Sequence, residues 1–177
     1  MGTSVELQRV LGLPPVTQIG VAVKDVRNAA DYYSSIFSIG PFNIYEFIPE
    51  RHWYIEQLSP LKLLMAKAPW GNVELELVQP LEGKTIHKDF LESHGEGLQH
   101  LGFDVSNYEE IYERFIRAGF TPLQRVETYY PAYKGYAKAA YFDTHRIGGI
   151  VFEIMWRSWV TKVVNLPIPM NHVTETP

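Results

Sequence analysis

The sequence predicts an α+β fold made of two tandem copies of one module, each a strand, a helix and then three strands. The first observation is a repeat, because the segment that begins at Gln18 is written again, with changes, from His100. The second is that both copies open on an alternating strand with glycine at its third position, followed by a polar turn and a helical stretch. The third is that both copies close on an apolar strand with an acidic residue, Glu76 or Glu153. Such a repeat must be recognised first, since missing it assigns the wrong fold.

The first module is expected over residues 16–82, after a leader at residues 1–15. Its opening strand alternates, and the helix that follows has apolar residues on one side and ends before Gly40. Further strands are expected, the last of them after a turn that contains Gly71. The expected elements are a strand at 16–23, a helix at 29–37 and, as four candidates for the three later strands, residues 42–48, 53–58, 62–66 and 73–78.

A linker with a short helix is expected at residues 83–97, and the second module at 98–160. The helix of this module is expected to stop at Gly119, a typical C-terminal cap. Residues 161–177 contain several prolines and are expected to form a tail. The expected elements of the second module are a helix at 108–118, strands at 121–127, 137–142 and 150–156, and a tyrosine-containing loop at 129–136.

The composition is that of a compact globular protein. Of the 177 residues, 46% are hydrophobic and 20% are charged, so a core can form. The formal charge of −4 provides no basic surface for nucleic acid, and no lysine and arginine cluster suggests a membrane partner. No targeting or membrane-spanning segment is evident, so a cytoplasmic protein is expected. Cysteine is absent, so a metal could be held only by histidine, carboxylate or amide groups.

The first strands of the two modules each present a metal-binding type of side chain beside small residues. Because alternate residues share a face of a strand, Gln18 lies on the face of Gly20, and His100 lies on the face of Gly102. We expect the small residues to leave room for something other than protein.

The closing strands each place an acid among apolar residues. A lone buried carboxylate is very costly, so Glu76 and Glu153 each need a partner. Their matched positions in the repeat indicate a shared one. A divalent cation would neutralise both, with the His100 nitrogen and the Gln18 amide oxygen completing one side of its shell.

Each of these residues has a simpler interpretation when it is taken alone. A single histidine on a strand is commonly a hydrogen-bonded structural residue, and Glu76 could pair with Lys62 or Lys67. Four polar residues at equivalent strand positions favour the metal site. Other polar and aromatic residues are interpreted as surface groups or as a loop that folds over the cleft. Those at the surface are His87, His94 and His172. His145 and Arg146 are interpreted as part of a solvated turn, with contact to a carboxylate or phosphate as the alternative. The residues that either pack at the surface or lie at the cleft mouth are His52, Trp53, Tyr129, Tyr130, Tyr133 and Tyr136.

The repeat, together with residues 76–81, 90–100 and 149–153, resembles the vicinal oxygen chelate superfamily, which includes glyoxalase I and methylmalonyl-CoA epimerase. The resemblance covers about residues 16–156. It implies a U-shaped, open-barrel sheet of two βαβββ modules with a divalent metal in a central cleft. It also implies that the metal ligands are Gln18, Glu76, His100 and Glu153.

The resemblance implies a metal-dependent isomerase, epimerase or lyase that transfers a proton α to a metal-bound carbonyl. Glu153 is the first candidate for the base, and Glu74, two residues from Glu76 on the same face, is the second. The ion would be Zn, Co, Ni, Mn or Fe, and a hydrogen bond should orient the free ring nitrogen of His100. The substrate would be an acyl-CoA, a 2-oxo compound or a thiol adduct, and the protein a homodimer.

Two other functions remain open on the same fold. One is a ring-cleaving dioxygenase or other metal oxygenase, although Gln18 replaces a histidine that its iron site would need. The other is a small-molecule-binding protein of the antibiotic-resistance type, whose members lack the metal ligands. Lys62 also stands where some epimerases are thought to hold a second acid or base, which weakens an assignment to methylmalonyl-CoA.

Overall fold

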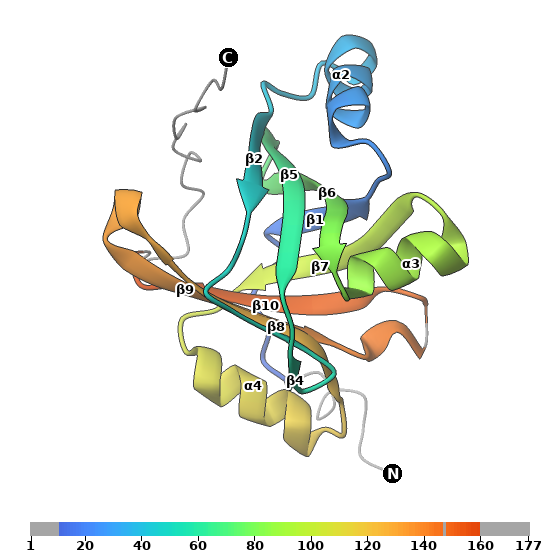
Figure 1. Ribbon diagram of the computed structural model, residues 1–177. Helices are drawn as coiled ribbons and strands as arrows, with labels where there is room; N and C mark the ends of the chain where they lie inside the picture. The colour runs from blue at the N-terminus through green and yellow to red at the C-terminus, as the bar shows by residue number, and fades with distance from the viewer. Residues whose placement is uncertain (1–10, 147, 160–177) are drawn as a thin grey trace.

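A mixed, curled sheet of ten strands forms the body of the computed structural model, which describes residues 11–146 and 148–159 (Figure 1). The order of the strands is β2-β5-β6-β1-β7-β10-β9-β8-β3-β4. The predicted α+β fold, two modules that form an open barrel, is confirmed. The tail expected at 161–177 and most of the leader at 1–15 lie outside the described residues.

The elements fall into two groups joined by one helix. The first group is β1 (Gln18–Ala22), α2 (Val26–Phe37), β2 (Asn43–Phe47), β3 (Arg51–Tyr54), β4 (Gln57–Leu58), β5 (Leu61–Trp70) and β6 (Val73–Gly83). The joining helix is α3 (Ile86–His94). The second group is β7 (Gly97–Asp104), α4 (Tyr108–Arg117), β8 (Pro122–Tyr130), β9 (Gly135–Phe142) and β10 (Val151–Arg157), with short 3-10 turns η1 (Pro131–Tyr133) and η2 (Thr144–Arg146).

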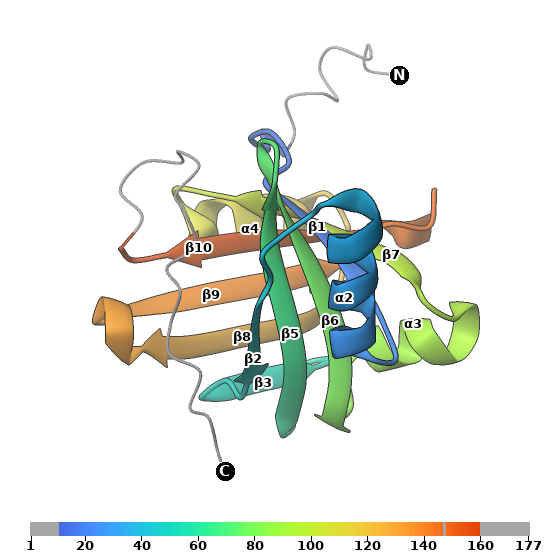
Figure 2. The ribbon, with the colours of Figure 1, turned by 90° about the horizontal axis from the view of Figure 1, so that it is seen from above.

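The two groups meet where β1 pairs with β7 in the antiparallel sense. Each of these strands has a parallel partner on its other side, β6 next to β1 and β10 next to β7. From this join the two halves diverge in direction, and in Figure 2 β5 and β6 run across the direction of β8, β9 and β10. The closing strands that carry the acids therefore lie close to the join.

Two expected elements differ from the structure. The strand expected at 53–58 is a hairpin, because Ile55 and Glu56 both adopt positive φ values of 47° and 61° and form a two-residue turn. The usual Asn-Gly or Asp-Gly signal for such a turn is missing, so the sequence did not reveal it. Strand β3 also pairs with β8, and this hairpin extends the half of the sheet that the second module forms.

Half of the tyrosine-containing loop expected at 129–136 is strand. Tyr129 and Tyr130 end β8, Tyr136 lies in β9, and only η1 and Lys134 connect the two strands. The cross-strand pair of Tyr129 and Tyr136 has ring centroids 4.9 Å apart, which stabilises the end of this hairpin.

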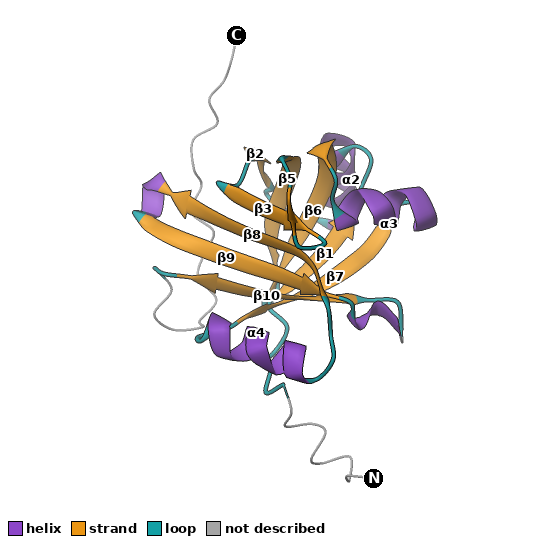
Figure 3. Ribbon diagram, turned by 60° about the horizontal axis from the view of Figure 1, so that its bottom comes forward, coloured by secondary structure: helices purple, strands orange, loops and turns teal. Residues whose placement is uncertain are grey.

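Helices α2 and α4 cover the outer face of the sheet, one on each half (Figure 3). Each begins at a side-chain cap: Asp25 accepts hydrogen bonds from the first turn of α2, and Asn107 accepts one from Glu110 N in α4. Their apolar sides form two outer cores, and a third cluster lines the interior. Within the described ranges, 11–146 and 148–159, no helix has the length and apolar character that a membrane crossing requires.

The outer core under α4 should depend on one aromatic stack. The rings of Phe115 and Phe142 lie 4.1 Å apart at 9°, and both side chains are fully buried. Replacing Phe115 with alanine should lower the free energy of unfolding by about 3–5 kcal/mol, measured by urea denaturation. The adjacent Ile116, 39% exposed, is the control, and its replacement with alanine should cost less than about 1 kcal/mol. Equal losses would contradict this account of the core.

Candidate metal centre

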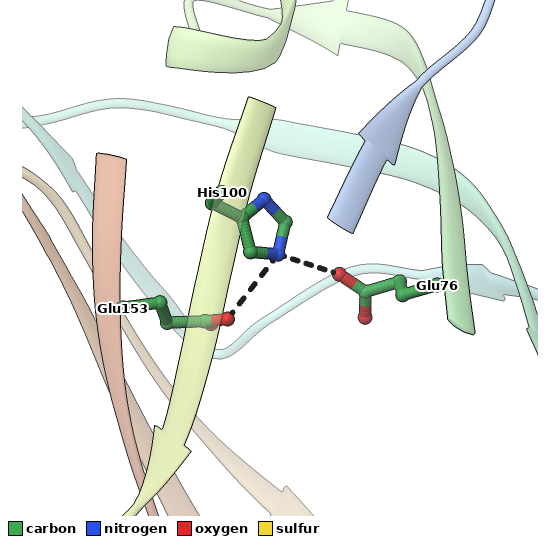
Figure 4. Close-up of side chains that lie close together, drawn as sticks. All are labelled: Glu76, His100 and Glu153. Carbon is green, nitrogen blue, oxygen red and sulfur yellow. Dashed lines mark ion pairs between the residues drawn. The ribbon is translucent and has the colours of Figure 1, made fainter. Parts of the chain in front are cut away.

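Three buried side chains converge beside the join of the two modules. Glu76 Oε2 lies 3.2 Å and Glu153 Oε2 3.4 Å from His100 Nε2, and Figure 4 shows the three groups pointing toward one another. One ligand atom from each residue lies within 4.8 Å of the others. The three residues are at most 3% exposed, so water does not compensate their charges.

Gln18, the fourth predicted ligand, lies at the same place. Its Oε1 is 3.3 Å from His100 Nε2, and its amide nitrogen donates to Glu74 Oε1 at 2.7 Å and to Glu76 Oε1 at 3.3 Å. The structure therefore brings all four predicted ligands and Glu74 into one cluster. That they bind a metal stays a prediction.

The donor set fits a cation. Glu76 Oε2 and Glu153 Oε2 are buried without a hydrogen-bond partner. The other ring nitrogen of His100, Nδ1, lies 2.6 Å from Gln99 Oε1, an acceptor, so Nδ1 donates a hydrogen bond and Nε2 is the ring nitrogen that would bind a cation. Burial alone would lower the pKa of His100, but Glu76 and Glu153 outweigh it and raise the pKa. The surroundings thus favour a positive charge next to Nε2, which a divalent ion would supply.

Glycines explain how these side chains fit between paired strands. A Cβ atom on Gly20 would lie 1.8 Å from the His100 ring, and one on Gly102 would lie 2.9 Å from Gln18 Cβ. The expectation that the small residue Gly20 leaves room for something other than protein was wrong, because the imidazole of His100 fills that space. Each glycine instead makes room for the donor residue on the opposite strand.

Lys67 is a further charged member of the cluster. Its Nζ lies 2.8 Å from Glu76 Oε1 and 3.0 Å from Glu74 Oε1, whereas Lys62 pairs with Glu46 at 3.1 Å. Burial alone would lower the pKa of Lys67, but the two glutamates outweigh it and raise the pKa well above its usual value. The ammonium compensates the charge of one carboxylate of the cluster, and a divalent ion would add further positive charge beside the others.

His87 was expected at the surface, and this was wrong. It is 1% exposed, on the first turn of α3, with its ring 5.6 Å from that of His100 and 5.5 Å from that of Tyr141. Burial, helped by the nearby His100, lowers the pKa of His87 to about 3, so this imidazole is neutral. The sequence offered one signal, its position next to the buried Ile86 at the start of an amphipathic helix. His94 is exposed, as expected, and His172 lies outside the described residues.

The remaining candidates divide between cavity and surface. A cavity of about 670 Å³ opens from the cluster between the two halves of the sheet, and Tyr130 and Tyr133 line it. Tyr129 and Tyr136 are not among its lining residues. His52 is buried, and its Nδ1 lies 3.0 Å from the backbone carbonyl oxygen of Ser59. The guanidinium carbon of Arg125 lies 4.6 Å from the centroid of the Trp53 ring. His145 and Arg146 are exposed in η2, as a solvated turn would place them.

Residues 17–141 match the family model of the glyoxalase/bleomycin resistance protein/dioxygenase superfamily. The chain belongs to this superfamily. A curated relative, the uncharacterized protein YqjC of Bacillus subtilis (strain 168), is 31% identical over 85 residues, which are 48% of this chain and 53% of YqjC. The match thus spans about half the length of that relative.

Solved structures of the superfamily fold have the same architecture at low sequence identity. A methylmalonyl-CoA epimerase from Streptomyces coelicolor, in complex with 2-nitronate-propionyl-CoA, is similar with a TM-score of 0.58 and 17% identity, over 82% of this chain and 95% of that one. A 4-hydroxymandelate synthase from Streptomyces coelicolor is similar with a TM-score of 0.57 and 15% identity, over 82% of this chain and 48% of that one. Such identities show the fold and leave the activity open.

The close contact between the His100 ring and Gly20 can be tested by substitution. Replacing Gly20 with alanine should displace the imidazole and lower the free energy of unfolding by about 1–3 kcal/mol, as overpacking does. Gly97→Ala is the matched control on β7, because its Cβ would lie 3.9 Å from Phe90, an ordinary contact. Urea denaturation should detect a change of less than about 1 kcal/mol for the control. A harmless Gly20→Ala would show that His100 can sit elsewhere.

Proposed function

We propose that the protein is a metal-dependent isomerase, epimerase or lyase that transfers a proton α to a carbonyl group. The observation that carries the proposal is the buried group of Glu76, His100 and Glu153, in which two carboxylate oxygens without hydrogen-bond partners face one imidazole nitrogen. The group lies at the wall of a cavity large enough for a small-molecule substrate.

The ligands available are one imidazole, two carboxylates and the amide oxygen of Gln18, which suits a borderline divalent ion such as Zn, Co, Ni, Mn or Fe. When bound, such an ion polarises a substrate carbonyl and makes the adjacent C–H more acidic. Gln99 would hold the His100 ring in the orientation that directs Nε2 at the ion.

The two equivalent glutamates differ in their neighbours, which supports different roles. Lys67 faces Glu76 across β5 and β6, whereas Tyr141 faces Glu153 across β9 and β10. Burial alone would raise the pKa of Glu76, but Lys67 and His100 outweigh it and lower the pKa. Burial raises the pKa of Glu153, and the negative charge of Glu76 raises it further. The nearby His100 acts in the opposite direction but does not cancel these two effects. Glu153 is therefore the better proton acceptor, whereas Glu76 stays ionised.

Glu74 is the second candidate for proton transfer. Its Oε1 already accepts from Gln18 and contacts Lys67, so a large part of its hydrogen-bonding capacity is used inside the cluster. We assign it the role of holding Gln18 and Lys67 in place, with acid–base action as the alternative.

The oxygenase alternative rests on the likeness to 4-hydroxymandelate synthase. Non-haem iron oxygenases commonly use two histidines and one carboxylate, whereas the group here has one histidine and two carboxylates. The ligand types thus favour proton transfer. An acyl-CoA substrate has support from the ligand bound to the similar epimerase. A homodimer remains a proposal.

Loss of His100 should abolish tight metal binding. Since removing an outer partner of a metal ligand already costs about 10–100-fold in affinity, His100→Ala should weaken Zn²⁺ binding by more than about 100-fold in calorimetric titration. His94→Ala is the control, because His94 is an exposed histidine. Circular dichroism should show that both variants fold, and full metal occupancy in the His100 variant would count against the centre.

Removing the proposed base should separate catalysis from metal binding. Glu153→Gln keeps an oxygen ligand, so it should retain much of the metal while solvent deuterium enters the substrate α-carbon about 10²–10⁴-fold more slowly. Glu74→Gln, the matched amide substitution in the same cluster, should be milder. The measurement is deuterium wash-in over acyl-CoA and 2-oxo substrates. No exchange with any of them, alongside oxygen uptake with a catechol, would replace this proposal with the oxygenase one.

A further inference from the structure

The inner face of the second module changes its character with distance from the candidate metal centre. Strands β10, β9 and β8 pair side by side, so their inward-facing residues form rows across the sheet. On β10 the first row contains Glu153, which belongs to the centre, and the second contains the apolar Met155. The third row is polar again, and its members Arg157, Ala137 and Thr128 all line the cavity. A cationic group therefore lies at the cavity wall, apart from the centre.

Arg157 has hydrogen-bonding capacity that the protein does not use. Its Nη2 donates to Asp104 on β7, whereas its Nε is buried and has no hydrogen-bond partner among residues 11–146 and 148–159. A guanidinium offers five N–H donors, and a buried donor without an acceptor costs free energy. The side chain as a whole is 32% exposed, so a ligand in the cavity can reach it. An anion in the cavity would supply the missing acceptor.

The two lysines at the cavity wall are engaged more fully by carboxylates. The Nζ atom of Lys67 lies 2.8 Å from one glutamate of the cluster and 3.0 Å from another. The Nζ atom of Lys138 lies 2.6 Å from Glu109, which does not line the cavity. Of the cationic side chains along the described part of the cavity, Arg157 is thus the one with a donor to spare.

Thr128 and Ala137 complete the surroundings of the guanidinium. Thr128 is 7% exposed and can donate its hydroxyl hydrogen, and Ala137 lies between it and Arg157. Because Ala137 projects by a single methyl group, a ligand over it can contact both neighbours. The next residue on this face of β9, Gly135, is covered, since a Cβ atom there would lie 2.7 Å from the Trp159 ring. The third row is therefore the last one on β9 that a ligand can lie over.

The spacing of the two polar ends sets the size of the ligand. Arg157 is four residues beyond Glu153 on β10, which is about 13 Å at the usual rise of a strand. Its guanidinium reaches back to Asp104, which lies two residues, or about 7 Å, beyond Gly102, the partner of Glu153 in register. A carbon chain advances about 1.3 Å per bond, so a chain of about five or six carbons connects the two ends when its terminal contacts are included. The phosphates of an acyl-CoA lie farther from the thioester carbonyl than this.

We propose that Arg157 and Thr128 form a carboxylate-binding subsite, and that the substrate is a 2-oxo diacid of about five or six carbons. Its 2-oxo end faces Glu76, His100 and Glu153, and its distal carboxylate accepts hydrogen bonds from Arg157. Carboxylate–guanidinium pairs combine charge with directed hydrogen bonds, which fixes the substrate along the cavity. The proposal rests on the proposed function for the end at the metal, and it selects one of the substrate classes considered there.

The first test compares matched acids on the full chain loaded with Zn²⁺. 2-Oxoglutarate and 2-oxopentanoate share a carbon chain and differ in ending with a carboxylate or a methyl group, and 2-oxoadipate and 2-oxohexanoate form a longer pair. Calorimetric titration measures binding, so the result does not depend on turnover. At least one diacid should bind about tenfold or more tightly than its monoacid partner, because a charge-assisted hydrogen bond contributes more than a methyl contact. A preference for the diacid in neither pair overturns the proposal.

A double variant assigns this preference to Arg157. Arg157→Gln together with Asp104→Asn removes both members of the ion pair, so neither charge is left without its partner. It should weaken the preferred diacid by at least about tenfold and leave the matching monoacid within about twofold, which also shows that the variant is folded. The matched control is Arg146→Gln with Asp143→Asn, an ion pair of the same kind that does not line the cavity, and it should change neither acid. Unchanged diacid binding in the Arg157 double variant overturns the proposal.

Two further measurements test the hydroxyl group and the nature of the anion. Thr128→Val keeps the shape of the side chain and removes its donor, so it should weaken the diacid by about two- to tenfold. No change would refute the role of Thr128. If the Arg157 double variant weakens propionyl-CoA and leaves both diacids unchanged, the guanidinium holds a phosphate of coenzyme A and the carboxylate subsite is refuted.

The two proposals fail separately. Binding of a diacid that depends on Arg157, without deuterium exchange α to the carbonyl of any substrate, would refute the proton-transfer function and keep the subsite. Deuterium exchange in a monoacid or an acyl-CoA, without a preference for either diacid, would keep the function and refute the subsite.

Discussion

The pairing of β1 with β7 is the constraint on which the candidate site depends. Its antiparallel register places Gln18 opposite Gly102 and His100 opposite Gly20, so each donor side chain lies over a glycine of the other module. The parallel partners β6 and β10 then bring one glutamate each beside those glycines. A shift of one residue would turn the whole set to the outer face, since side chains alternate along a strand. Fold and site are therefore specified by the same contact.

The repeat gives the two halves similar backbones and different electrostatics. The position across from each glutamate holds Lys67 in one half and Tyr141 in the other. An ammonium favours the ionised carboxylate, whereas a phenol in a dry site does so far less, and the two glutamates respond with opposite pKa shifts. The two equivalent glutamates thus have different electrostatic surroundings within similar backbones.

The curled sheet also separates stability from chemistry. Its outer face packs on α2 and α4 through aliphatic and aromatic clusters, whereas its inner face surrounds the cavity and the charged cluster. Inner residues can therefore change with little effect on the outer cores. This arrangement agrees with the variety of enzymes that share the fold, and it means that the inner side chains must be used to argue the activity.

The sequence by itself determined the two-module fold and the equivalent strand positions of the four candidate ligands, because a repeat and a period of two residues are local properties. Only the tertiary structure decided that His87 is buried and that β3 extends the other half of the sheet. The turn at Ile55 carries no local signal, and the other contacts join residues far apart in sequence. They arise when the sheet curls and its inner faces meet, which no short pattern of residues encodes.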